Sequence, residues 1–146
     1  MRGYFGIAVI NMKTEINYGT LFRSANCFGA DFLALVGRRF KKQSSDTMRS
    51  ERHIPLFEFA TIEALFGTLP FGCQPIAIEI TETARFLQDY HHPDRAMYIL
   101  GPEDGSLGDS VLKRCVSVLR IPTSHCLNVA VAGSIVMYDR ISKEGE

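Results

Sequence analysis

The fold class is decided by the stretch Ala96-Met-Tyr-Ile-Leu-Gly-Pro-Glu-Asp-Gly-Ser-Leu-Gly108, in which an apolar run leads directly into a turn rich in glycine. The run 96–100 has the length and composition of a strand that is covered on both faces of a sheet. The glycines of the turn let backbone N–H groups approach a ligand. Open α/β sheets bind ligands at the carboxyl ends of their strands, so this turn is the first candidate for a site.

On both sides of this stretch, short apolar runs alternate with segments of helical length, which predicts an α/β fold. Because no linker or repeat divides the 146 residues, we expect one domain over 1–146. Asn17, Thr61 and Asn128 are expected to cap the amino ends of helices, and Gly29 the carboxyl end of the first. The expected strands are 5–10, 32–36, 55–59, 75–80, 96–100 and 116–121, and the expected helices are 18–28, 61–65, 84–90, 106–115 and 128–142.

The composition is that of a globular protein, with 46% hydrophobic and 22% charged residues. No apolar run approaches the ~20 residues needed to cross a bilayer, so no membrane association is expected. The four cysteines and four histidines show no zinc-binding spacing. We therefore expect free thiols, no metal and a reducing, cytoplasmic location.

The formal net charge is zero, from 16 basic and 16 acidic residues. This balance argues against a protein held on nucleic acid by bulk charge alone. The stretch 38–53 is locally basic, and it is either a solvated loop or a surface that contacts phosphates. Composition does not choose between the two for its basic residues, Arg38, Arg39, Lys41, Lys42, Arg49 and Arg52.

Polar residues at three places could carry chemistry, although each has an ordinary structural interpretation. Arg23 could be a surface arginine, Gly101–Glu103 a tight turn, and Asn128 a helix cap. A nucleophile pair formed by His125 with Ser124 or Cys126 is disfavoured. Neighbouring residues rarely have the geometry for base activation, and no orienting acid is evident.

Taken together, these segments resemble the SpoU (TrmH-type) branch of the SPOUT RNA methyltransferases. The resemblance rests on three motifs in order: Asn17-x-Gly19-x-x-x-Arg23, Leu100-Gly-Pro-Glu-Asp-Gly-Ser-Leu107, and Ile121-Pro122 followed by Cys126-Leu-Asn-Val-Ala-Val-Ala132. It implies a SPOUT-type knotted (deep trefoil) fold, with a mostly parallel sheet flanked by helices. It also implies a homodimer, which agrees with a final helix that is apolar nearly all round.

The resemblance implies transfer of a methyl group from S-adenosyl-L-methionine to a ribose 2′-hydroxyl of RNA. Transfer RNA is favoured over ribosomal RNA, because the chain has no room for a separate RNA-binding domain. The alternatives are a catalytically silent dimeric RNA-binding module of the same fold, and methylation of ribosomal RNA or of a base. In such a family the basic stretch 38–53 becomes an expected RNA contact.

The implied catalytic residue is Arg23, which we expect to grip the adjacent phosphate, since a guanidinium stays protonated. Many relatives have serine where this chain has Cys126, and a thiol donates hydrogen bonds poorly, so only a backbone contact is secure there. The other implied catalytic residues are Asn17, Glu103 and Asn128. The implied cofactor contacts are Ile78, Glu79, Leu100, Gly101, Ile121, Cys126 and Leu127.

Overall fold

In a computed structural model, residues 3–37 and 54–144 are described, and seven strands form one sheet of order β3-β2-β1-β6-β4-β7-β5. Every strand pairing in this part of the chain is parallel, as expected. The basic residues of 38–53 lie outside the described residues. The strands are β1 (Tyr4–Ile10), β2 (Phe32–Val36), β3 (Leu56–Phe59), β4 (Gln74–Ile78), β5 (Arg85–Phe86), β6 (Arg95–Leu100) and β7 (Ser117–Arg120).

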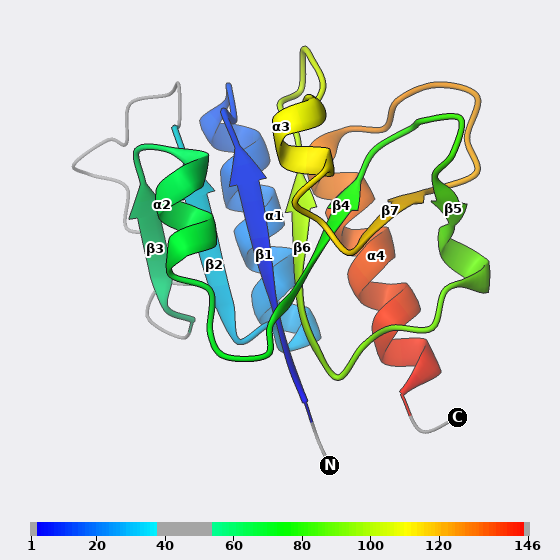
Figure 1. The fold of residues 1–146 in the computed structure, drawn as a ribbon, viewed down its shortest axis with the longest axis horizontal. Coiled ribbons are helices and arrows are strands. Elements are labelled where there is room, and N and C mark those ends of the chain that lie inside the picture. The colour runs from blue at the N-terminus through cyan, green and yellow to red at the C-terminus, as the bar shows by residue number, and fades with distance from the viewer. Residues whose placement is uncertain (1–2, 38–53, 145–146) are drawn as a thin grey trace.

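Helices cover both faces of the sheet, with α1 and α4 on one side and α2 and α3 on the other (Figure 1). Because side chains alternate along a strand, Ile7 and Val9 of β1 pack toward α1 and α4, whereas Ala8 and Ile10 pack toward α2 and α3. None of the described helices is long and apolar enough to cross a membrane. The helices are α1 (Glu15–Phe28), α2 (Ile62–Gly67), the short 3-10 helix η2 (Leu87–Asp89), α3 (Asp109–Leu112) and α4 (Val129–Lys143).

The first helix begins three residues earlier than its sequence indicates. Thr14, not Asn17, is the amino-terminal cap, and its hydroxyl accepts a hydrogen bond from the Asn17 backbone N–H. At the other end Gly29 is the cap as predicted, with a φ of 79° that favours glycine. Thr61 and Asn128 cap α2 and α4, which confirms those two predictions.

Two predicted helices are wrong or too long. Instead of a helix over 84–90, the chain pairs Arg85 and Phe86 with the edge of β7 and then makes one 3-10 turn. The helix predicted over 106–115 is confined to 109–112, because Gly108 has a φ of 85° and the chain must turn to enter β7. Over 84–90, strand pairing overrides local helix propensity.

The final helix lies against α1 at a point of close approach. A Cβ atom on Gly133 would lie 2.5 Å from Cδ1 of Leu21, so a larger residue does not fit there without a shift. The outward side of α4 remains open to solvent, although its composition predicts burial: Val131 is 46% exposed and Tyr138 is 64% exposed. The trefoil knot implied by the resemblance stays a prediction.

A buried polar cluster fixes α4 near the amino ends of β1 and β6. His92 lies 2.6 Å from the hydroxyl of Tyr98 and 2.7 Å from Oδ2 of Asp139. Because the carboxylate can only accept, the neutral ring carries its proton on Nε2, and Nδ1 accepts from Tyr98. Arg140, only 4% exposed, donates to Tyr98 and to the backbone carbonyl of Asp94. Burial lowers the pKa of His92 despite its bond to Asp139.

Candidate active site

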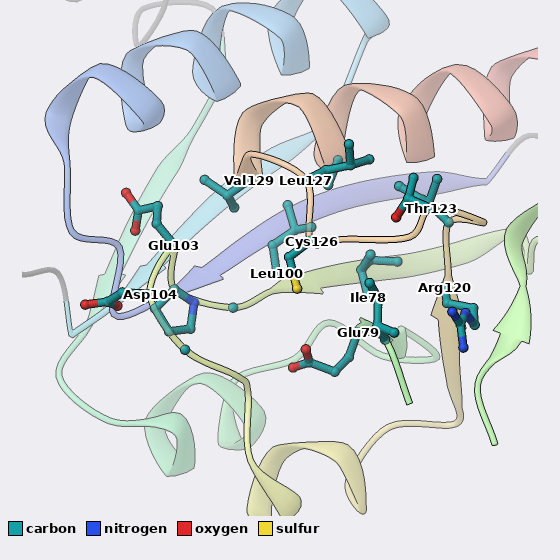
Figure 2. A pocket seen from close by; sticks show the side chains of 16 residues that line it. Ile78, Glu79, Leu100, Glu103, Asp104, Arg120, Thr123, Cys126, Leu127 and Val129 are labelled. Atoms are coloured by element: carbon teal, nitrogen blue, oxygen red, sulfur yellow. The ribbon is translucent and has the colours of Figure 1, made fainter. Parts of the chain in front are cut away.

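A cavity of about 350 Å³ opens where β4, β6 and β7 end (Figure 2). Its volume lies in the range of about 300–1,000 Å³ that is usual for small-molecule sites. Three segments that follow these strands form its walls, and residues from the start of α4 close it. They are Ile78, Glu79 and Ile80; Leu100 to Gly105; Arg120, Ile121, Thr123, Cys126 and Leu127; and Val129 and Ala132.

The structure brings to this one cavity all seven residues that the sequence suggests as cofactor contacts, namely Ile78, Glu79, Leu100, Gly101, Ile121, Cys126 and Leu127. They are spread over 50 residues of sequence, from 78 to 127, and meet because parallel strands end at the same edge of the sheet. Their role as cofactor contacts remains a prediction.

The cavity combines apolar strand ends with charged side chains. Among the described residues, the charged ones that line it are the carboxylates of Glu79, Glu103 and Asp104 and a single cation, Arg120. In Figure 2, Arg120 lies on the opposite side of the cavity from Glu103 and Asp104. Glu79 is held in place because one of its carboxylate oxygens accepts a hydrogen bond of 2.7 Å from the Leu107 backbone N–H.

Glu103 reaches back from the turn after β6 to the amino end of α1. Its Oε1 accepts from the backbone N–H of Lys13 at 2.7 Å. Its Oε2 accepts from Thr14, both from the backbone N–H at 2.9 Å and from the hydroxyl at 3.0 Å, and from Nδ2 of Asn17 at 2.9 Å. Partial burial alone would raise the pKa of Glu103, but these hydrogen bonds outweigh it and lower the pKa to about 2. Glu103 is therefore an ionised acceptor at neutral pH.

Asn17 connects Glu103 to the start of α4. While its Nδ2 donates to Glu103, its Oδ1 accepts a bond of 2.8 Å from Nδ2 of Asn128. Oδ1 of Asn128 in turn accepts hydrogen bonds from the backbone N–H groups of Ala130 and Val131, two of the orphan donors in the first turn of α4. We call this connected set, Glu103, Asn17 and Asn128, the polar chain. It unites the three sequence motifs in one hydrogen-bonded unit.

Arg23 is separate from the polar chain. Six residues along α1 from Asn17, it is displaced by about 9 Å along the helix and points to a different side. Its side chain is exposed and does not line the cavity. The structure thus joins three of the four implied catalytic residues, and leaves the fourth on the surface of α1.

Sequence reasoning missed Arg120 and Thr123 as cavity residues. Arg120 directly precedes Ile121-Pro122, and its sequence context is that of an ordinary strand residue. Only the pairing of β7 with β4 shows that it lines the cavity. The Nδ1 of His125, which sequence analysis disfavours as part of a nucleophile pair, lies 3.1 Å from the hydroxyl of Ser124. Among the described residues no carboxylate orients His125, so the pair still lacks the third group of a nucleophilic site.

One comparison with known proteins identifies a family. The family model described as "SpoU rRNA Methylase family" matches residues 4–138. In a search of curated proteins, no sequence matched the chain.

Several solved structures share the fold. One, described as "Structural insights into the 2-OH methylation of C/U34 on tRNA", has a TM-score of 0.84 and 23% identity, and the match covers 97% of this chain and 96% of the other. An rRNA methyltransferase from Sinorhizobium meliloti matches with a TM-score of 0.85 and 22% identity over 99% of this chain and 58% of its own. The SpoU methyltransferase AviRb from Streptomyces viridochromogenes, in complex with AdoMet, matches with a TM-score of 0.86 and 17% identity over 100% of this chain and 60% of its own. This chain thus spans less than two thirds of the last two.

Proposed function

Because this chain belongs to the SpoU rRNA Methylase family, whose model matches residues 4–138, we propose that it is an S-adenosyl-L-methionine-dependent RNA methyltransferase that modifies a ribose 2′-hydroxyl. The observation that carries the proposal is the cavity at the ends of β4, β6 and β7, with the polar chain beside it. The proposed unit is a single methyltransferase domain over 1–146, acting in the cytoplasm.

The cavity fits the cofactor in size and in chemistry. Ile78, Leu100 and Ile121 offer the apolar surface that a flat adenine ring requires. The three carboxylates of the lining complement the positive charge of the cofactor. When bound, S-adenosyl-L-methionine supplies an electrophilic methyl group on a sulfonium centre. The backbone and side chains of the seven residues named above would hold it.

The polar chain would position the reactants. With a pKa of about 2 and hydrogen bonds from three residues, Glu103 stays ionised and is occupied in holding the amino end of α1. The side-chain amides of Asn17 and Asn128 are likewise occupied, because they are hydrogen-bonded to each other and Asn128 also caps the start of α4. We therefore assign these three residues to positioning, and reserve for Arg23 the contact with the RNA phosphate beside the reacting hydroxyl.

Transfer RNA is the favoured substrate. A solved structure described as concerning "2-OH methylation of C/U34 on tRNA" shares the fold over 97% of this chain, which supports this choice. Further contacts with the RNA are expected from the basic stretch 38–53, which lies outside the described residues.

A homodimer is supported by the exposed apolar side of α4. Val131, Tyr138 and Ile141 are exposed on this helix, and Ile16 on the neighbouring α1 is 81% exposed. Large apolar side chains exposed on neighbouring helices are typical of an interface with a second subunit.

The test is to incubate the protein with S-adenosyl-L-methionine labelled in its methyl group and with either total tRNA or ribosomal RNA, and then to identify the labelled nucleosides by mass spectrometry. We expect a 2′-O-methylated nucleoside from tRNA. Arg23→Ala should abolish transfer, whereas Arg114→Ala, a control on the remote helix end at α3, should not. A methylated base would refute the ribose assignment, and RNA binding without any transfer would favour the silent module.

A further inference from the structure

We propose that Arg120 is the anchor for the carboxylate of the cofactor's amino-acid end. This inference rests on the proposed function and deepens it, because it assigns one end of the ligand to one side chain. S-adenosyl-L-methionine carries two positive groups, a sulfonium and an ammonium, and one negative group, the carboxylate.

Every charged residue of the lining except Arg120 would repel that carboxylate. Glu79 and Glu103 cannot easily turn away, because backbone N–H groups of Leu107 and Lys13 hold them. Asp104 carries the third negative charge of the lining, and its carboxylate lies 3.9 Å from Nζ of Lys13. The electrostatic field of the cavity therefore leaves one favourable place for a ligand carboxylate, on the Arg120 side.

The guanidinium of Arg120 is held at one edge and lacks a partner at the other. Its Nη1 donates to the carbonyl of Thr81 at 3.3 Å, and its central carbon stands 5.4 Å from the centre of the Phe86 ring. Its Nε is buried and makes no hydrogen bond to any described residue. A buried donor without an acceptor is costly, so its presence calls for an explanation.

A carboxylate supplies that explanation. Nε and Nη2 form the edge of the guanidinium that faces away from Nη1, and this pair of donors matches the two oxygens of a carboxylate. Nη2, like Nε, bonds to no acceptor among the described residues. Since Nε is closed to solvent, the contact requires the guanidinium to turn toward the cavity. This movement gives up one long hydrogen bond to Thr81 and the contact with the Phe86 ring.

Isothermal titration calorimetry with two ligands tests the anchor without any measurement of activity. The first ligand is S-adenosyl-L-homocysteine, and the second is its decarboxylated counterpart, which differs only by loss of the carboxylate. Arg120→Met, which keeps an unbranched apolar stem against Phe86, should weaken binding of the first about 10- to 100-fold and leave binding of the second unchanged. Arg120→Lys, which keeps the charge and loses the paired donors, should fall between wild type and Arg120→Met.

The outcomes separate the anchor from the proposed function. Equal weakening of both ligands would mean that Arg120 only maintains the fold of the cavity, and would overturn the anchor. So would unchanged binding of both, including the case in which Arg120→Met weakens RNA binding instead. Failure of the wild-type protein to bind S-adenosyl-L-homocysteine or S-adenosyl-L-methionine would overturn the proposed function itself, and the anchor with it. If Arg120→Met does not fold, the comparison of the two ligands is made on Arg120→Lys.

Discussion

Replacing Glu103 by glutamine is the sharpest test of the polar chain. The carboxylate accepts four hydrogen bonds, three of them at Oε2. A glutamine can keep its oxygen at that position, but its NH₂ group then faces the backbone N–H of Lys13, two donors at 2.7 Å in the present geometry. The change removes the charge from the three remaining bonds as well.

The expected loss in free energy of unfolding is about 2 kcal/mol at pH 7. Hydrogen bonds to charged groups contribute about 1.5–3 kcal/mol each, but Glu103 is half-buried and water partly replaces the bond from Lys13, so we take the lower end for the whole set. The loss should depend on pH. The folded pKa of about 2 lies below the ordinary value of 4.5, so the stabilisation by Glu103 is complete above about pH 5 and disappears as the pH falls toward 2.

The assay is urea unfolding followed by circular dichroism at pH 7 and at pH 3. Glu63→Gln is the matched control, because Glu63 is 67% exposed and makes a single ion pair of 3.7 Å with Arg114, and such surface pairs contribute less than about 1 kcal/mol. The difference between wild type and Glu103→Gln should shrink between pH 7 and pH 3. A difference below about 0.5 kcal/mol at pH 7, or one of equal size at both pH values, would refute the reasoning.

Asn128→Ala should lower the free energy of unfolding, measured with urea, by about 2 kcal/mol, because it removes both the helix cap and the bond to Asn17. Asn128→Asp keeps the cap and should lower it by about half as much. Equal losses in the two variants would contradict separate contributions of the cap and of the bond. Gly133→Val should lower the midpoint of thermal unfolding by about 5 °C or more. Even a Cβ atom there would lie 2.5 Å from Leu21, and overpacking costs about 1–3 kcal/mol. An unchanged midpoint would contradict close packing of α1 and α4. Because burial lowers the pKa of His92, protonation favours the unfolded chain, and the stability of the wild type should fall as the pH drops below about 6.5. The fall should be smaller in His92→Gln than in His91→Gln, which serves as the exposed control. An identical pH dependence of stability in both variants would contradict this role of His92.

The elements that could be predicted from sequence are those whose signal is local. The apolar runs of β1, β2 and β6 are buried on both faces as expected, and Gly29, Thr61 and Asn128 are caps as expected. The errors arise where distant contacts decide. Thr14 and Asn17 are equally suitable caps by residue type, and Thr14 prevails where Glu103, 89 residues away, binds its backbone N–H.

The candidate site likewise combines residues that the sequence motifs predict with residues that only distant contacts bring there. The order of the motifs predicts that Gly101, Ile121 and Cys126 belong together, and the cavity assembles them. No periodicity or spacing indicates that Arg120 lines the site. The acidic residues that surround the cavity with it follow strands β4 and β6, which are distant from it in the sequence. The predicted helix over 84–90 fails for the same physical reason: pairing of Phe86 with Arg120 across the sheet edge is invisible to local propensity.

The polar chain also constrains the order in which the protein can form during synthesis. Its two side-chain bonds join residues separated by 86 and 111 positions, so Asn17 emerges from the ribosome long before either of its partners. Closing such long loops costs entropy before any contact stabilises them, which slows folding. A growing chain can hold α1 and β1, yet it has no complete site until Asn128 and the start of α4 have emerged. Nascent chains released early should consequently lack the capacity to bind the cofactor, however much of the sheet they contain.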